Sequence, residues 1–463
     1  MKAEIFVYRT LIEAPAGEVF AWHTWPGVIE RLTPPWERVK VLERTGGIEN
    51  GARVALRMKA GPLGMRWVAE HRDYVEGRQF KDVQIAGPFR RWEHTHLVEP
   101  DGPAACYLED RIEYALPLGL GLARGHVRRR LERLFRYRHR TTAEDIAAHM
   151  AHRGAGPMRI LVSGSTGLIG SALIPFLQTG EHEVVRLVRS KPKPPESIRW
   201  APEDSFVDEA GLRGIDAVVH LAGESIAGGR WTKARKARIY LSRVEGTRLL
   251  TEALARMDRP PRVMVCASAI GYYGDRGDEL LEEDSGHGRD FLAGLCVDWE
   301  AAVEPAWKAG VRVVSLRTGI VLSPAGGALA KMLPPFRMGL GGRFGSGEQY
   351  MSWISLDDQL GAILHALATG PLEGPVNATA PNPMTNRRFT ETLAKVLARP
   401  ALFPVPAAAA RLAFGEMAQA LLLASQRVVP AKLLATEFRF RHPELEGALR
   451  HLLGRSKETS GHS

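Results

Sequence analysis

Long apolar runs and clustered cysteines are both missing from this chain of 463 residues. No stretch approaches the roughly 18 consecutive apolar residues of a membrane span, and the opening residues have no signal-peptide apolar core. The cysteines Cys106, Cys266 and Cys296 have neither the density of a disulfide framework nor the spacing of metal ligands. These absences argue against a membrane span, and we expect a protein of the reducing cytoplasm.

An excess of acidic charge is also missing, because the formal net charge is +10. Residues 124–140 alone hold eight arginines, while Val127, Leu131, Leu134 and Phe135 recur there at helical spacing. This pattern predicts an amphipathic helix with a solvated basic face; the alternative is binding to an anionic surface or partner. No nucleic-acid motif accompanies the helix, so we expect no nucleic-acid partner.

The length and the ordinary composition, 45% hydrophobic and 25% charged, predict a globular chain of two or three domains. Residues 150–157 are polar, contain glycine and end in proline, which is typical of a linker. We therefore expect one domain over residues 1–149, a linker over 150–157, and a second unit over 158–463.

The first unit has the pattern of several strands followed by one long helix. Alternating or β-rich runs predict strands over residues 4–11, 52–58, 67–74, 91–98 and 105–116. A short helix is expected over 15–22, and the basic helix closes the unit. This order predicts an α+β layout in which a curved antiparallel sheet wraps a long helix.

Two segments of this unit, Ala14–Phe20 and Asp110–Pro117, resemble the helix-grip superfamily, which is START-like and polyketide cyclase/dehydrase-like. The resemblance implies an apolar cavity between sheet and helix and a hydrophobic small-molecule ligand. His94 and His96 lie two apart on one predicted strand and therefore share a face. The sequence offers no third ligand beside them, so we expect core or cavity-lining histidines rather than a metal site.

A glycine-rich loop opens the second unit. The apolar run 160–162 predicts a buried strand, and residues 172–177 predict a helix. Between them stand Gly164, Gly167 and Gly170. In such a loop the first glycine permits a tight turn, the second a close approach of phosphates, and the third close packing of helix on strand. With the free N–H groups of the helix N-terminus, this arrangement predicts a pyrophosphate-binding loop.

The end of the next predicted strand, residues 182–190, distinguishes between the two nicotinamide cofactors. NAD sites usually carry an acidic residue about 20 positions after the glycine loop, where it binds the ribose 2′-hydroxyl. Here Arg189, Ser190 and Lys191 stand instead. Basic side chains suit a 2′-phosphate, which a carboxylate would repel. The pattern favours NADP; the alternative is that Arg189 is a solvated loop residue.

Strand and helix continue to alternate along the second unit. Apolar strands are expected over residues 216–221, 262–267 and 311–316, and each is followed by a motif of small or polar residues. Repeated strand–helix units predict a doubly wound, parallel α/β sheet of the Rossmann type, with ligands at the carboxyl ends of its strands.

These motifs resemble the extended short-chain dehydrogenase/reductases, the sugar-nucleotide epimerase/dehydratase superfamily. More narrowly, they are similar to an atypical epimerase-like oxidoreductase family sometimes labelled a cell-division inhibitor. The resemblance is carried by Gly164–Gly170, Leu221–Glu224, Arg230–Thr232, Ser242–Arg243, Gly271–Asp275, Trp299–Glu300, Leu316–Gly319, Met338–Gly347, Trp353–Ile354 and Ser425–Val428.

The resemblance runs from Met158 to about Leu453 and implies an NADP-binding Rossmann domain with a C-terminal substrate lobe, expected from about residue 375. The cofactor-binding positions that we expect are Gly164, Ser165, Thr166, Gly167, Leu168, Ile169, Gly170, Arg189, Ser190, Leu221, Ala222, Gly223, Arg243 and Val321.

The resemblance also implies a tyrosine and a lysine one helical turn apart, with a serine or threonine that orients the substrate oxygen. The chain lacks this pair, because Leu292 and Cys296 stand at the corresponding positions. Ser268 remains, and Tyr272 or Tyr273 is expected as the acid or base. Cys296 is expected to be a buried apolar thiol rather than a redox-active one.

Four further charged residues stand near these motifs. Arg317 and Arg343 either grip an anionic substrate or are ordinary surface charges. Asp357 and Asp358 begin a predicted helix over 356–367, and we expect them to cap it and to complement its dipole.

Together these features predict an NADP-dependent, epimerase-like oxidoreductase that acts on an unidentified small substrate, with an N-terminal domain that binds a hydrophobic ligand. The missing tyrosine–lysine pair leaves open a non-catalytic NADP-binding sensor or scaffold, connected with cell division, that couples the cofactor to a ligand or partner. A third alternative is a lipid- or polyketide-binding module for which the nucleotide fold is only a scaffold. The sequence predicts neither a metal site nor an oligomeric state.

Overall fold

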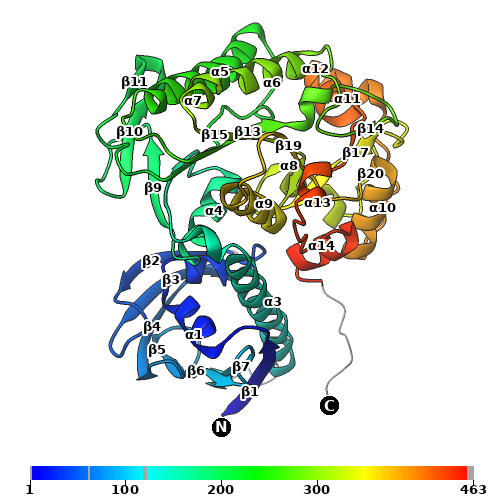
Figure 1. Cartoon of the computed structure of the whole chain (residues 1–463). Helices are drawn as coiled ribbons and strands as arrows, with labels where there is room; N and C mark the ends of the chain where they lie inside the picture. Colours follow the sequence, from blue (N-terminus) through cyan, green and yellow to red (C-terminus); the bar gives the residue numbers. More distant parts are fainter. Residues whose placement is uncertain (1–2, 61–62, 118–122, 456–463) are drawn as a thin grey trace. The chain divides into compact units, whose positions relative to one another are not determined.

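A computed structural model describes residues 3–60, 63–117 and 123–455 of the chain. The chain divides into two compact units, one formed mainly by the residues up to Arg153 and the other by those from Gly154 onward (Figure 1). This division lies within the predicted linker, although the last helix of the first unit continues to Ala151. No helix among the described residues combines the length and apolar character that crossing a membrane requires.

The N-terminal unit is a seven-stranded antiparallel sheet with one long helix, α3, beside it (Figure 1). Its strands are ordered β1-β7-β6-β5-β4-β3-β2. The elements are β1 (Glu4–Ile12), α1 (Ala16–Thr24), α2 (Val28–Arg31), β2 (Val39–Thr45), β3 (Arg53–Ala60), β4 (Leu63–Val75), β5 (Gln79–Ala86), β6 (Arg91–Pro100), β7 (Cys106–Ala115) and α3 (Arg124–Ala151).

Side-chain alternation explains how this sheet meets the helix. Every second residue of β6 and β7 is buried, and on α3 Leu131, Phe135 and Ile146 are buried. The predicted helix-grip layout is confirmed. Two strands were not predicted: β2, an edge strand whose residues are largely exposed, and β5, whose polar residues obscure the alternation.

The C-terminal unit is built on an eight-stranded sheet ordered β11-β10-β9-β8-β12-β13-β15-β19. All neighbouring pairs are parallel except β10 with β11. The strands are β8 (Arg159–Ser163), β9 (Glu183–Val188), β10 (Ser197–Ala201), β11 (Phe206–Val207), β12 (Ala217–His220), β13 (Val263–Ala269), β15 (Arg312–Thr318) and β19 (Gly374–Ala378). The predicted doubly wound α/β fold is confirmed.

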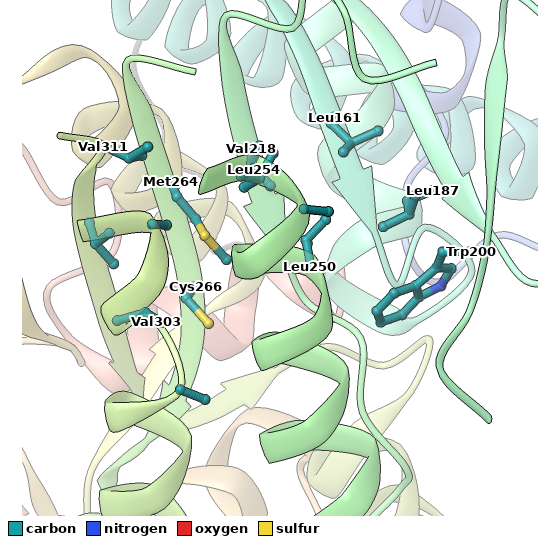
Figure 2. Packing of buried hydrophobic residues seen from close by; sticks show 14 of the residues in the cluster. Leu161, Leu187, Trp200, Val218, Leu250, Leu254, Met264, Cys266, Val303 and Val311 are labelled. Atoms are coloured by element: carbon teal, nitrogen blue, oxygen red, sulfur yellow. The ribbon is translucent and has the colours of Figure 1, made fainter. Parts of the chain in front are cut away.

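Helices cover both faces of this sheet (Figure 1). The main helices are α4 (Leu168–Gln178), α5 (Lys233–Ala255), α6 (Phe291–Ala301), α7 (Glu304–Lys308) and α9 (Leu356–Ala368). Apolar side chains of β8, β9, β12 and β13 meet those of α5 in one buried cluster, which includes Leu161, Met264 and Leu250 (Figure 2). Burial of this size is the main stabilising contribution, about 1.5–3 kcal/mol for each large side chain.

A second core defines a smaller lobe at the carboxyl end of the sheet. Its short strands are β14 (Leu280–Leu281), β16 (Ile320–Leu322), β17 (Tyr350–Met351), β18 (Trp353–Ser355), β20 (Met384–Thr385) and β21 (Arg427–Val428). Its helices are α8 (Gly327–Arg337), α10 (Asn386–Leu397), α11 (Ala407–Phe414), α12 (Glu416–Ala418), α13 (Ala431–Ala435) and α14 (Leu445–Leu452).

The expected start of this lobe near residue 375 is a boundary error. Residues 374–378 form β19 of the main sheet, whereas Leu322, Phe336 and Trp353 already belong to the core of the lobe. The lobe therefore interleaves with the main sheet, since the chain leaves the sheet for the lobe three times, after β13, after β15 and after β19.

Candidate functional site

The glycine-rich loop connects β8 to α4 in a turn that depends on its glycines. Gly164 has a φ of +67°, and a Cβ there would lie 2.7 Å from the carbonyl carbon of Leu221. A Cβ at Gly170 would overlap the carbonyl oxygen of Gly164. Gly167 is exposed, and its N–H donates to the Gly164 carbonyl at 2.9 Å. The loop thus packs against the end of β12 and leaves the N–H groups at the start of α4 available to an anion.

A buried serine–histidine pair holds the neighbouring turn in place. Ser163 Oγ lies 2.8 Å from His220 Nδ1 and accepts from the N–H groups of Leu221 and Ala222 at 3.0 and 3.1 Å. Burial lowers the pKa of His220 to about 4, so its ring is neutral. Neither residue was predicted to take part in the site; the only signal for each in the sequence is a polar residue at the last position of an apolar strand.

Arg243 of α5 closes over the same turn. Its Nη1 donates to the carbonyl of Glu224 at 2.9 Å, and a Cβ at Gly223 would lie 3.0 Å from its Cζ. Ser242 Oγ accepts from the N–H of Glu224 at 3.0 Å. The absence of a side chain at Gly223 therefore allows a half-buried cation to approach the backbone beside the glycine loop.

The remaining expected cofactor positions lie at the same edge of the sheet. Arg189 and Ser190 are exposed directly after β9, and Thr166 is exposed in the glycine loop. Because β9, β8 and β12 are adjacent and parallel, their carboxyl ends meet at one edge. Val321 is half-buried on β16, which follows β15. A loop with glycines at its three closest approaches, a helix N-terminus and an exposed arginine fit a dinucleotide that carries a 2′-phosphate.

Ser268 and Tyr273 belong to a saturated buried network. Ser268 Oγ donates to Glu300 at 2.7 Å, and Arg317 grips both oxygens of that carboxylate at 2.9 and 2.8 Å. Tyr273 is fully buried, accepts from Arg317 at 3.1 Å, and donates to Asn377 Oδ1 at 2.7 Å. This role of Glu300 and Asn377 was not predicted from the sequence.

These contacts change what can be expected of three predicted residues. Burial raises the pKa of Tyr273 to about 12, and its hydroxyl is engaged by Asn377 and Arg317, so these contacts favour a structural role. Arg317 is 3% exposed and is paired with Glu300, so it is neither a surface charge nor available to bind an anionic substrate. Ser268 is 4% exposed and faces the same carboxylate.

Tyr272 differs from its neighbour. It is half-buried, and within the described residues its hydroxyl has no hydrogen-bond partner in the protein. The Cζ atom of Arg317 lies 3.4 Å from the centroid of its ring, which is a close cation–π contact. Tyr272 follows β13 in a short turn and thus stands at the carboxyl edge of the sheet.

The positions expected for the tyrosine–lysine pair are buried in α6. Leu292 is 7% exposed and belongs to the main core, and Cys296 is 3% exposed. Burial raises the pKa of the Cys296 thiol to about 12, so it is a neutral, apolar thiol as predicted.

The expectation that Asp357 and Asp358 cap α9 is wrong, because the cap is Ser355; both aspartates lie in the first turn, where negative charge complements the helix dipole. Ser355 Oγ accepts from the N–H of Asp358 at 2.9 Å. The Asp358 carboxylate also accepts from the N–H groups of Arg441 and His442, at 2.6 and 3.2 Å. Arg343 is half-buried in the lobe, and its carbonyl accepts from Val405.

The N-terminal unit contains a cavity of about 490 Å³ between its sheet and α3. Most of its wall is apolar and includes Val28, Leu56, Trp67 and Phe135. The predicted apolar cavity is therefore present. One part of the wall is polar, and the predicted cavity-lining histidines, His94 and His96, lie there.

The doubly wound sheet and its glycine loop define a Rossmann protein of the short-chain dehydrogenase/reductase class. Residues 160–378 match the NAD dependent epimerase/dehydratase family, and residues 12–138 match the polyketide cyclase / dehydrase and lipid transport family. Residues 405–452 match a domain of unknown function, DUF1731. Both resemblances noted in the sequence are thereby confirmed.

The chain belongs to the epimerase family. It is 46% identical over 290 residues to an epimerase family protein of Mycobacterium bovis, covering 63% of this chain and 96% of the relative. It is 39% identical over 299 residues to epimerase family protein SDR39U1 of Homo sapiens, covering 64% of this chain and 100% of the relative.

Two solved structures extend the comparison. The nucleoside-diphosphate sugar epimerase of Corynebacterium glutamicum is 33% identical with a TM-score of 0.80, covering 98% of this chain and 91% of that one. Human SDR39U1, solved with NADPH, is 38% identical with a TM-score of 0.60, covering 64% of this chain and 99% of that one. The first match includes both units of the present protein.

Proposed function

We propose that the C-terminal unit binds NADP and catalyses an epimerase-like oxidoreduction on a small substrate. The observation that carries this proposal is the glycine loop followed, at the end of β9, by exposed Arg189 where an NAD site has a carboxylate. The human relative solved with NADPH supports the same cofactor. The cofactor would rest on Gly164–Gly170 and against Leu221–Gly223, with its 2′-phosphate at Arg189 and Ser190.

The bound cofactor supplies or accepts a hydride, and this chain must handle the accompanying proton. Tyr272 is our candidate for that role, because it stands at the carboxyl edge of β13 with a hydroxyl that no described protein group engages. Its phenol would donate a proton to a substrate carbonyl or take one from a substrate hydroxyl. Arg317, fixed by Glu300, places positive charge against the ring and would act as a positioning residue.

A second candidate function is a non-catalytic NADP sensor or scaffold. It is favoured by Leu292 and Cys296, which are buried where the family's chemistry needs a tyrosine and a lysine. In either case we propose that the cavity of the N-terminal unit takes a hydrophobic small molecule, because its wall is mainly apolar.

The cofactor proposal is tested by titrating the full chain with NADPH and with NADH. Replacing Arg189 with Ala should weaken NADPH binding about 10- to 100-fold, the effect of losing a charge-assisted hydrogen bond to the phosphate. NADH binding should not change. Arg186→Ala is the matched control, because Arg186 is also exposed but lies within β9, before its carboxyl end. Equal affinity of the unaltered chain for both cofactors would contradict the proposal.

A measurement of turnover distinguishes an enzyme from a non-catalytic sensor. A panel of carbonyl compounds is offered to the protein with NADPH, and Tyr272→Phe should lower the rate about 100-fold or more while NADPH binding persists. Tyr273→Phe is the control, since its buried hydroxyl is engaged by Asn377 and Arg317. Tight NADPH binding without turnover of any compound would instead favour the sensor.

A further inference from the structure

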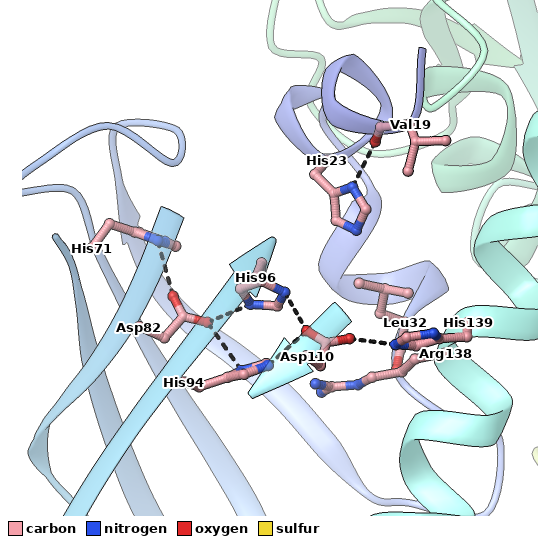
Figure 3. Close-up of polar contacts among 10 residues, drawn as sticks. All are labelled: Val19, His23, Leu32, His71, Asp82, His94, His96, Asp110, Arg138 and His139. Atoms are coloured by element: carbon pink, nitrogen blue, oxygen red, sulfur yellow. Dashed lines mark hydrogen bonds and ion pairs between the residues drawn. The ribbon is translucent and has the colours of Figure 1, made fainter. Parts of the chain in front are cut away.

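A second buried polar cluster lies in the N-terminal unit, in the polar part of its cavity wall (Figure 3). Asp82 of β5 stands opposite His94 of β6 in the sheet register, and His96 stands opposite Asp110 of β7. His71 of β4 stands opposite Asp82. Because side chains alternate along a strand, these residues share the face of the sheet that turns toward α3. The nucleotide site uses none of them.

Three of these side chains aim one atom each at a common point. Asp82 Oδ2 lies 3.2 Å from His96 Nε2 and 3.7 Å from His94 Nδ1, and all three atoms are within 4.8 Å of one another. Ligands bonded tetrahedrally to a metal at about 2.1 Å are separated by about 3.4 Å. The spacing therefore matches a site with two imidazoles and one carboxylate.

The opposite nitrogen of each imidazole meets Asp110. Its Oδ1 lies 2.7 Å from His94 Nε2 and 2.6 Å from His96 Nδ1, and its Oδ2 lies 2.6 Å from His139 Nε2. Metal-binding histidines characteristically donate their other ring N–H to a carboxylate, which fixes the tautomer and aims the free nitrogen at the metal. Asp110 hydrogen-bonds to His94 Nε2 in this way. His96 Nδ1 approaches the same carboxylate without hydrogen-bond geometry, and His96 Nε2 hydrogen-bonds to Asp82, so a metal ion at the common point would replace that hydrogen bond.

If both rings donated to Asp110, no hydrogen would remain between their other nitrogens and the Asp82 carboxylate. If His94 and His96 both donate to Asp110, their other nitrogens present lone pairs to the carboxylate of Asp82. Lone pairs this close repel one another unless a cation lies between them. A proton on His96 is one solution, and the two carboxylates raise its pKa to about 9 against the effect of burial. A metal ion at the common point is the other.

The fixed charges favour a divalent ion with one further anionic ligand. Asp82 and Asp110 contribute two negative charges, and the guanidinium of Arg138, which also lines the cavity, contributes one positive charge. With neutral imidazoles, a divalent ion would bring this group to a net charge of +1. An anionic head group in the cavity would offset that charge, and the apolar wall would suit the rest of such a molecule.

We propose that Asp82, His94 and His96 bind one divalent transition-metal ion of the Zn²⁺ or Fe²⁺ class, with an open coordination position toward the cavity. Two histidines and one carboxylate with open positions are a recurring ligand set for such ions. The open position would take the carboxylate or similar anionic head of an apolar molecule. The sequence predicted no metal here because Asp82, the third ligand, lies on the strand that its pattern does not reveal.

The test uses the full chain without a histidine tag, stripped of metal with a chelator. Zn²⁺ is titrated calorimetrically, and Co²⁺ is titrated while the visible absorption is recorded, because its d–d bands report protein ligands directly. We expect one equivalent of each ion in the N-terminal site, competition between the two ions, and visible Co²⁺ bands. His94→Gln, His96→Gln and Asp82→Asn should each abolish the bands, and Asp110→Asn should weaken Zn²⁺ binding about 10- to 100-fold.

A second trio provides the matched control. Asp357, His442 and His451 of the C-terminal unit also offer ligand atoms within 4.8 Å of one another. His442→Gln makes the same chemical change as His94→Gln and should leave the N-terminal signal intact. Circular dichroism reports whether each variant is folded. The Co²⁺ absorption spectrum of the unaltered chain tests for the metal site without any substitution.

Three results would overturn the proposal. The first is an unaltered chain that gives neither Zn²⁺ heat nor Co²⁺ bands. The second is a folded His94→Gln or His96→Gln variant that retains them. The third is their loss in His442→Gln, which would assign the ion to the other trio. If the variants at positions 82, 94 and 96 do not fold, retention of the bands in His442→Gln still supports the assignment, and their absence there contradicts it.

Discussion

The two units each bury a polar network, and the networks differ in how completely donors and acceptors are matched. In the C-terminal unit, Arg317 donates two hydrogen bonds to Glu300 and one each to Tyr273 and the Glu283 carbonyl. Ser268 supplies a further hydrogen to the same carboxylate. Each of these donors has an acceptor, so the network is closed and suits a structural role.

The network of the N-terminal unit has the opposite balance. The carboxylates of Asp82 and Asp110 face both ring nitrogens of His94 and His96, and acceptors outnumber hydrogens unless one ring is protonated (Figure 3). This network also borders a cavity, whereas Tyr273 and Arg317 lie in the interior. The contrast suggests that a buried network that needs a proton or a metal ion to balance its acceptors, next to an open space, is a better indication of a binding site than buried charge alone.

Breaking the closed network should produce the largest effect on stability. Glu300→Gln leaves the buried guanidinium of Arg317 without its counter-charge and should cost about 3–5 kcal/mol in the C-terminal unit. Hydrogen exchange of the amides of β13 and β15 measures this loss locally, because two units need not unfold together. The control is Glu304→Gln, which removes an exposed pair with Lys308 and should cost about 0.5 kcal/mol or less. A loss below 1 kcal/mol for Glu300→Gln would contradict a closed network.

The open network should give the N-terminal unit a distinct pH dependence when metal is absent. The pKa of His96 is raised from 6.5 to about 9, so its stabilising contribution is complete below pH 6.5 and is lost as the pH rises through 9. Burial lowers the pKa values of His23 and His94 to about 4, so their contribution is present above pH 6.5 and is lost as the pH falls through 4. Stability should therefore peak near pH 6.5.

Each of these pKa shifts corresponds to roughly 3 kcal/mol. The groups that face His96 are Asp82, Asp110, His23 and His94. Hydrogen exchange of the amides of β6 and β7 in chelator, from pH 5 to pH 9, measures the profile. His96→Gln should remove its alkaline limb, and an unchanged limb in that variant would show that another group is responsible.

Sequence patterns predicted the fold well because the relevant signals are local. Gly164, Gly167 and Gly170 lie in one loop, and the strand ends that they predict to be neighbours are adjacent in the sheet. Arg189 is exposed next to that loop as its position after a strand suggests. Boundaries failed where long-range pairing decides, as in β19, which joins the main sheet from within the lobe.

Site residues that depend on tertiary partners could not be predicted in the same way. Ser268 and Tyr273 were expected to take part in catalysis, but they are buried and hydrogen-bond to Glu300 and Asn377, which are distant in the sequence. Conversely, no third metal ligand was expected beside His94 and His96, because Asp82 lies on another strand, whose apolar alternation is weak. A single sequence shows residue types but not which of them meet across a sheet.

The smallest expected effect is the difference in stability between variants of the two adjacent tyrosines. Tyr273→Phe removes one acceptor from Arg317 and one donor from Asn377 inside the closed network, which should cost about 1–2 kcal/mol. Tyr272→Phe removes a hydroxyl that no described protein group engages, so it should change stability by about 0.5 kcal/mol or less. Hydrogen exchange of β13 measures both variants. If Tyr272→Phe destabilised the unit as much as Tyr273→Phe, its hydroxyl would have a structural partner, and the separation of a structural tyrosine from a catalytic one would fail.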